Sequence, residues 1–239
     1  MTAQLKAAEP EWKGARVGEE RFAGYVAHEL RTPLATQRCL LELALADPDA
    51  DVAGWREIGE DVLHACRQQE RLLEACLTLA RSRSGLRRHE TVDIAAIALA
   101  ALEAHDLSEF ESLVALEPAW VSGDPVLLER LAANLISNAA RHNIAGGWIE
   151  VTTRTELGNA ILRVANTGPL VPAGELQRLF QPFQRLDSNP RTSNDGVGLG
   201  LAIVEAIATA HTARVSASPR AAGGLEIDVS FPASGQEPR

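Results

Sequence analysis

The N-terminal third of the chain has a spacing of apolar positions that predicts two long helices. From about Glu19 to Ala46, and again from about Gly54 to Ser82, mostly apolar residues recur in alternating steps of three and four, as on one face of a helix. The second run keeps this spacing over more than three heptads, which is typical of a coiled-coil seam. The seam positions are Val26, Leu30, Pro33, Gln37, Leu40 and Ala44 in the first helix and Trp55, Ile58, Val62, Ala65, Gln69, Leu72, Cys76 and Leu79 in the second.

A further apolar stripe lies beside the seam of the second helix. One partner helix would leave part of this widened face in water, so we expect two hairpins to associate over residues 19–83 as a dimeric four-helix bundle. The additional stripe consists of Leu63, Cys66, Leu73, Leu77 and Ala80.

The pattern changes after a polar segment at 84–90, which holds a glycine and predicts an inter-domain linker. Helical and alternating stretches then follow one another, and some of the strands are joined as hairpins. This order predicts an α/β domain at 91–232 and fits a doubly wound parallel sheet poorly. Residues 1–18 and 233–239 are expected to lie outside both domains. The predicted elements are helices at 93–104, 125–142 and 200–211 and strands at 148–155, 160–166, 213–218 and 225–231, with short apolar runs at 113–116 and 119–122.

Composition excludes several classes of protein. The 23 basic and 32 acidic residues give a net charge of −9, which argues against non-specific binding to nucleic acid or to an acidic membrane surface. No apolar run reaches about 18 residues, so we expect no membrane-spanning helix. The 3 cysteines are too few for a disulfide framework and wrongly spaced for a zinc site.

The stretch "YVAHELRTPL", residues 25–34, is unusual for a packing helix. His28, Glu29 and Thr32 are polar, and Pro33 removes a backbone hydrogen bond at a cost of about 3 kcal/mol in a helix interior. This combination indicates that a requirement other than packing selects these residues.

A second candidate site lies in the helix that opens with Asp124 as N-cap and Pro125 as first residue. Asn134, Asn138 and Arg141 are spaced four and three apart, so they share one face. Two carboxamides and a guanidinium can bind hydrated magnesium and the phosphates that it bridges. A solvated helix face is the alternative.

Two glycine-containing segments add to this candidate site. Gly196, Gly198 and Gly200 lead directly into a helix, where backbone N–H groups could approach phosphate closely. Asn166 ends a strand beside Gly168, which suits recognition of a base edge. Neither segment is a dinucleotide fingerprint or a P-loop, and each could be a plain turn.

Taken together and in this order, the pieces resemble the sensor histidine kinases of two-component signalling, from about Arg21 to Pro232. "FAGYVAHELRTPL" resembles the H-box, "NLISNAARHN" the N-box, "NTGP" a variant first glycine box, "LFQPFQRL" the F-box and "DGVGLGLAIV" the second glycine box. The resemblance implies an all-α helical hairpin, dimerising as a four-helix bundle, followed by an α/β sandwich ATP-binding domain of the Bergerat (GHKL) type.

The resemblance also implies roles for individual residues. His28 would accept the phosphoryl group, Glu29 would act as general base, and Thr32 would position water for dephosphorylation of the response regulator. Asn138 would be the magnesium ligand, and residues 187–195 would form a lid over ATP. The residues implied in binding ATP and Mg²⁺ are Asn134, Asn138, Arg141, His142, Asn166, Gly168, Gly196, Gly198, Leu199 and Gly200.

The implied function is ATP-dependent autophosphorylation on His28, followed by phosphotransfer to an aspartate in the receiver domain of a cognate response regulator, together with phosphatase activity. The expected partners are a second copy of the chain and that regulator, with no nucleic acid. The chain is expected in the cytoplasm, either as a separate protein or as the cytosolic part of a membrane-bound sensor. The alternatives are a kinase-dead scaffold or phosphatase, and another GHKL-type ATPase or serine kinase.

Three positions depart from the family pattern. Asn166 occupies a position where the family has aspartate, and Leu170 occupies the position of a glycine. At the position of Arg141 the family often has lysine. A neutral amide accepts a weaker hydrogen bond than a carboxylate, so Asn166→Asp is expected to tighten ATP binding. Alternatively, the NH₂ group of Asn166 donates to a buried acceptor that a carboxylate would repel.

Overall fold

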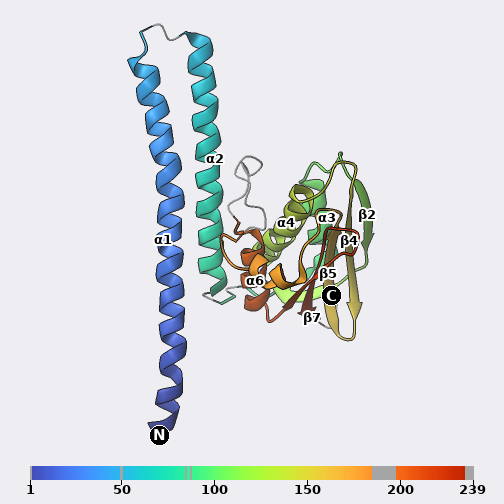
Figure 1. Cartoon of the computed structure of the whole chain (residues 1–239). Helices are drawn as coiled ribbons and strands as arrows, with labels where there is room; N and C mark the ends of the chain where they lie inside the picture. The colour runs from blue at the N-terminus through green and yellow to red at the C-terminus, as the bar shows by residue number, and fades with distance from the viewer. Residues whose placement is uncertain (1, 49–50, 84, 87, 185–197, 235–239) are drawn as a thin grey trace. The chain divides into compact units, whose positions relative to one another are not determined.

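The computed structural model describes residues 2–48, 51–83, 85–86, 88–184 and 198–234. The chain, drawn in Figure 1, divides into two compact units, Met1–Glu74 and Ala75–Arg239, and by these bounds the division falls within the second helix. Each unit is described separately below.

The first unit is a hairpin of two long helices, α1 (Thr2–Ala46) and the greater part of α2 (Val52–Arg83). The two helices predicted from the periodicity are therefore present. Helix α1 begins at Thr2, so it extends further toward the N-terminus than the helix predicted from about Glu19. Four alanines favour this extension, whereas Pro10 and Gly14 within it are poor helix formers.

Helix α1 continues through Pro33. On either side of the proline, hydroxyl groups donate to backbone oxygens one turn earlier, from Thr32 to His28 and from Thr36 to Thr32, each at 3.2 Å. Pro33 has no N–H for the carbonyl of Glu29. The turn that carries His28 and Glu29 thus lacks one bond of the backbone ladder.

Among the residues that the structure describes, the second unit is built on a five-stranded sheet. Its strand order is β2-β4-β5-β7-β6. Strand β2 runs parallel to β4, and the other neighbours are antiparallel. This mixed topology agrees with the α/β domain predicted from the sequence. The strands are Glu111–Leu116 (β2), Trp148–Glu156 (β4), Asn159–Asn166 (β5), Arg214–Pro219 (β6) and Leu225–Pro232 (β7).

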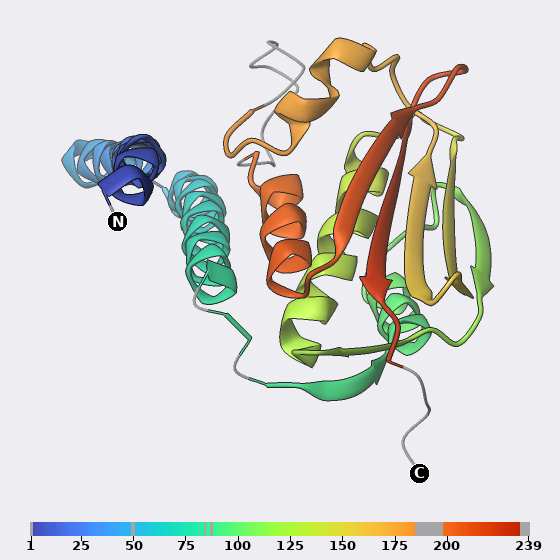
Figure 2. The ribbon, with the colours of Figure 1, turned by 90° about the horizontal axis from the view of Figure 1, so that it is seen from below.

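Three helices cover one face of this sheet: α3 (Ile94–Glu103), α4 (Pro125–Arg141) and α6 (Gly200–Ala210) (Figure 2). Alternate strand residues are buried on that face, as expected for a sheet covered on one side. The opposite face carries charge, since Arg163 makes two hydrogen bonds to Asp228, at 2.6 and 2.8 Å. The buried strand residues include Ile149, Val151, Leu162, Val164, Ile227, Val229 and Phe231.

A short two-stranded sheet closes one end of this unit. β1 (Glu90–Asp93) pairs antiparallel with β3 (Trp120–Gly123), so the predicted linker at 84–90 ends in a strand that the sequence pattern did not indicate. Four residues are too few to show an alternation. Asp93 fixes the junction, because its carboxylate accepts from Ala95 N at 3.0 Å, capping α3, and from Ala119 N at 2.9 Å.

The end of the chain is also tied to the second unit. Ala233 N donates to Gly158 O at 3.0 Å, and Ser234 N donates to Trp120 O at 2.9 Å. These two residues of the predicted tail at 233–239 therefore belong to the folded unit, and 235–239 lie outside the described residues. Across the described part of the chain, we find no helix with the length and apolarity needed to span a membrane.

His211 connects the two helices that carry the candidate site. Asp124 caps α4 as predicted, accepting from Val126 N at 3.1 Å with Pro125 as first helical residue. The backbone N–H of Asp124 donates to Nε2 of the buried His211 at 3.1 Å, and Nδ1 lies 2.8 Å from Ile207 O. Nδ1 therefore carries the proton of a neutral ring. Gly123 must be glycine here, because a Cβ would lie 2.4 Å from the ring.

Stability is expected to fall in mild acid because of His211. Burial lowers its pKa below the ordinary 6.5, against the raising effects of Ile207 O and Asp124, while His89 lowers it slightly. Because the pKa of His211 is lowered in the folded state, folding favours its neutral ring. The contribution of His211 to stability is therefore fully present above pH 6.5 and is lost as the pH falls through the folded-state pKa. The slope from one proton is at most about 1.4 kcal/mol per pH unit.

Urea unfolding between pH 5 and 8 measures this slope. His211→Gln keeps one donor and one acceptor but does not titrate, so the part of the slope due to His211 should disappear in that variant. An unchanged slope would show that other groups cause the acid sensitivity.

Candidate functional site

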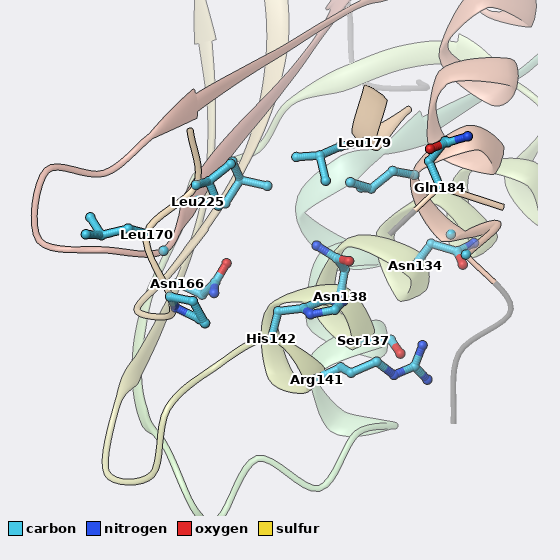
Figure 3. Close-up of a pocket in the computed structure, with 16 residues that line it drawn as sticks. Asn134, Ser137, Asn138, Arg141, His142, Asn166, Leu170, Leu179, Gln184 and Leu225 are labelled. Carbon is cyan, nitrogen blue, oxygen red and sulfur yellow. The ribbon is translucent and has the colours of Figure 1, made fainter. Parts of the chain in front are cut away.

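A pocket in the second unit gathers most of the residues predicted to bind ATP. It lies between α4, the end of β5, the start of α6 and the start of β7 (Figure 3). Leu199 is buried beside it as the N-cap of α6. Gly196 and the predicted lid at 187–195 lie outside the described residues. The predicted residues that line the pocket are Asn134, Asn138, Arg141, His142, Asn166, Gly198 and Gly200.

The pocket has a polar side on α4. Asn134, Ser137 and Asn138 are half-buried and Arg141 is exposed, and all four line the pocket. Nδ2 of Asn134 donates to Arg130 O at 2.7 Å, which leaves its carbonyl oxygen for another partner. This oxygen would lie 3.5 Å from a Cβ placed on Gly200. The first turn of α6 therefore faces the polar groups of α4.

The glycines of the pocket have separate structural reasons. Gly198 has φ 71°, which favours glycine, and a Cβ there would lie 3.1 Å from the backbone of Phe183. Gly200 and Leu201 open α6 at the pocket wall, where unpaired N–H groups and the helix dipole suit an anion. Gly168 lies beside the pocket, because a Cβ placed on it would lie 2.4 Å from the backbone oxygen of His142, which lines the pocket.

The opposite side of the pocket holds Asn166 between apolar groups. In Figure 3, Asn166, Leu170 and Leu225 lie across the pocket from Asn134 and Arg141. Asn166 is only 4% exposed, and its Nδ2 donates to Thr167 O at 2.7 Å. Because a carbonyl can only accept, this bond fixes the NH₂ group and leaves Oδ1 as acceptor. The geometry supports the alternative in which a carboxylate at 166 would be repelled.

Several pocket residues were not predicted from the sequence. Gly224 approaches Asn166 most closely, since a Cβ on Gly224 would lie 1.9 Å from Asn166 O, and its φ is 95°. The adjacent pair Gly223–Gly224 before a strand is a signal for such a close approach. Leu179 ends the short helix α5 (Leu176–Leu179), which follows the 3-10 turn η1 (Ala173–Glu175). The unpredicted pocket residues are Ser137, Pro169, Leu170, Val171, Leu179, Gln184, Leu201, Gly224 and Leu225.

His28, Glu29 and Thr32 lie together on α1, in the first unit. His28 is exposed and Glu29 is half-buried. The hydroxyl of Thr32 donates to the backbone oxygen of His28, and its lone pairs remain able to accept. Because the side chain of His28 is exposed, its ring is accessible to a phosphoryl donor.

Comparison with known proteins gives matches to both units. Residues 19–85 match the His Kinase A (phospho-acceptor) domain, and residues 123–235 match the histidine kinase-, DNA gyrase B-, and HSP90-like ATPase family. The first match contains His28, and the second contains the pocket residues described above.

Individual proteins are similar over most of the chain. Sensor protein CutS of Streptomyces coelicolor is 45% identical over 223 residues, which are 91% of this chain and 54% of CutS. The signal transduction histidine-protein kinase/phosphatase MprB of a Mycobacterium species is 31% identical, covering 91% of this chain and 43% of MprB. The chain thus spans about half the length of these relatives. A solved structure of mycobacterial sensor histidine kinase MprB, 30% identical, superposes with a TM-score of 0.54 over 61% of this chain and 97% of that one.

Proposed function

The chain belongs to the sensor histidine kinases of two-component signalling, and we propose that it transfers the γ-phosphate of ATP to its own His28 and then to an aspartate of a response regulator. One observation carries this proposal. The carboxamides of α4, the first turn of α6 and the buried Asn166 line a single pocket, although they are separated in sequence. A polar side for phosphates and an apolar side with one acceptor suit a purine nucleotide.

The transfer to His28 is a substitution at phosphorus. A nitrogen of the His28 ring attacks the γ-phosphorus of ATP, so that a P–N bond forms and the bond to the oxygen of ADP breaks. The other ring nitrogen loses its proton, and Glu29, the neighbouring carboxylate, is the proposed acceptor. An aspartate of the regulator then takes the phosphoryl group from His28. Water oriented by Thr32 would remove it from the regulator, a phosphatase activity of the kind named for the relative MprB.

Magnesium fits the polar side of the pocket. The proposed protein ligand is the carboxamide oxygen of Asn138, with Asn134 beside it, because both side chains line this side of the pocket. Such hard oxygen ligands suit Mg²⁺, which also keeps waters and nucleotide phosphates. The bound ion would neutralise phosphate charge, while Arg141 and His142 line the same side.

We further propose that the chain acts as a homodimer through the first unit. Several large apolar residues of the hairpin are exposed in the single chain, and burying them in a second hairpin would remove them from water. Such exposed residues of this unit include Leu34 (60%), Leu41 (40%), Leu43 (63%), Leu45 (75%), Trp55 (38%), Leu63 (55%) and Leu73 (54%).

Incubation with γ-labelled ATP and Mg²⁺ tests the proposed kinase activity. A phosphohistidine is stable in alkali and labile in acid, so label on the chain is expected to survive base and disappear in acid. Bound ATP without label would indicate a scaffold or phosphatase, and acid-stable label would indicate a serine kinase.

Asn166→Asp is expected to weaken ATP binding. A carboxylate oxygen in place of the NH₂ group would face the carbonyl oxygen of Thr167 at 2.7 Å, and two acceptors repel each other. Turning the side chain away would remove the acceptor for the base amino group. The expected loss is about fivefold, which corresponds to about 1 kcal/mol.

Calorimetric titration with ATP measures this effect. Asn159→Asp is a matched control, because it makes the same change at the other end of β5, where Nδ2 donates to Leu157 O. Tighter binding by Asn166→Asp than by the natural chain would show that the contact with Thr167 does not govern the site.

A further inference from the structure

Two glutamines occupy the seam between α1 and α2, where the pattern otherwise favours apolar residues. Gln37 of α1 is 8% exposed. Its Nε2 lies 3.3 Å from Oε1 of Gln69 on α2, with Cys66 Sγ at 3.4 Å and Val62 O at 3.5 Å. Nε2 of Gln69 in turn donates to the backbone oxygen of Leu30 on α1, at 3.2 Å. The amides therefore form a chain from α1 to α2 and back to α1.

This chain of hydrogen bonds ends next to the phosphoacceptor turn. Leu30 lies two residues after His28 and directly follows Glu29, whose carbonyl lacks a backbone donor because of Pro33. Gln69 thus supplies a side-chain donor to the turn whose backbone ladder is incomplete. The contact joins α2 to the backbone just below His28.

The amide chain is sensitive to the register of the two helices. Each residue adds about 1.5 Å along a helix and about 100° around it, so a shift of one residue would separate both amides from their partners. A buried polar group without a partner is unfavourable, whereas apolar seam residues pack acceptably against several neighbours. Single buried polar positions specify register in helical bundles for this reason.

We propose that the Gln37–Gln69 pair holds the turn of α1 that carries His28 in one register against α2, and so sets how His28 is presented for phosphorylation. This inference rests on the proposed kinase function. Both glutamines are positioning residues, because they act through the backbone of Leu30. They belong to the first unit, and the nucleotide pocket belongs to the second. Loss of the pair therefore changes the rate of phosphorylation at saturating ATP and leaves the KM for ATP unchanged.

The test is the variant in which Gln37→Leu and Gln69→Leu are combined. Removing both amides leaves no unpaired partner between them, so the Tm is expected to stay the same or rise. The rate of His28 phosphorylation at saturating ATP is expected to fall about fivefold or more. Gln69→Glu is a second variant, which keeps an acceptor for Gln37 but replaces the donor to Leu30 O with a carboxylate oxygen that this carbonyl repels, and it should lower the same rate.

Thr36→Val is the matched control. Its hydroxyl is adjacent in sequence to Gln37 and donates to the carbonyl of Thr32 within α1, so its loss removes a hydrogen bond near Pro33 without touching α2. This variant should keep the natural rate and KM.

The outcomes separate this inference from the proposed function. Absence of label on the natural chain would overturn both. A labelled natural chain with an undiminished rate in the double variant, or an equal fall with Thr36→Val, would overturn the positioning role alone. Loss of cooperative unfolding in both glutamine variants would show that the pair serves folding only, and a change in the KM for ATP would contradict the separation of the two units' roles.

Discussion

His28→Gln is expected to abolish incorporation of the γ-phosphate of ATP, with a fall of roughly 10³-fold or more in the labelling rate. Glutamine fills a similar space on the exposed face of α1, but its amide nitrogen shares its lone pair with the carbonyl and does not attack phosphorus. The fold of the hairpin should be unaffected, because His28 is exposed. ATP affinity should also be unchanged, since the pocket residues all belong to the second unit.

Labelling with γ-labelled ATP, alongside calorimetric titration with ATP, measures both parts of this expectation. His64→Gln is the matched control, because it makes the same change on α2, where the His64 ring contacts Gln68 at 2.9 Å. The control should label normally. Undiminished acid-labile label on His28→Gln would place the phosphoacceptor elsewhere in the chain.

Asn138→Ala is expected to weaken binding of ATP in the presence of Mg²⁺ by about 10- to 100-fold and to reduce labelling in step. A polar contact with a charged partner contributes about 1.5–3 kcal/mol, which corresponds to this range. The substitution should be tolerated by the fold, because the core of α4 is formed by other residues, such as Leu131 and Leu135. Alanine is also the best helix former.

Titration with and without Mg²⁺ distinguishes a metal ligand from a direct contact with the nucleotide. If Asn138 holds the ion, the natural chain and the variant should bind ATP equally in a chelating buffer and differ only when Mg²⁺ is added. An equal loss under both conditions would show that Asn138 contacts the nucleotide itself, and the proposed ligand would then have to be sought elsewhere in the pocket.

The elements that sequence alone predicted are those whose signals are local. The hairpin helices follow from apolar spacing over many turns. The start of α4 follows from an aspartate directly before a proline, and the structure confirms it at Asp124 and Pro125. Strands β4 and β5 show alternation over eight or more residues, with a glycine between them. In each case, residues within a few positions of one another carry the whole signal. β1, with four residues, has no such signal.

The motif residues of the pocket were also readable from sequence, but the pocket itself was not. Asn134 and Asn138 share a helix face by their spacing, and Gly198 precedes a helix. Their meeting with Gly224 and Leu225 depends on the antiparallel register that places Leu225 opposite Asn166. Residues nearly sixty positions apart meet only because the sheet pairs β5 with β7.

The remaining features depended on where single polar atoms lie. Whether Asn166 presents its oxygen or its NH₂ group was decided by the carbonyl of Thr167. Whether two seam glutamines pair with each other or face water was decided by the packing of α1 against α2, which brings Gln37 to Gln69 and Gln69 to Leu30. Periodicity assigns a residue to a face, since it depends only on the spacing along one element. The partner of a buried amide depends on atoms from another element, and therefore only the tertiary structure determines it.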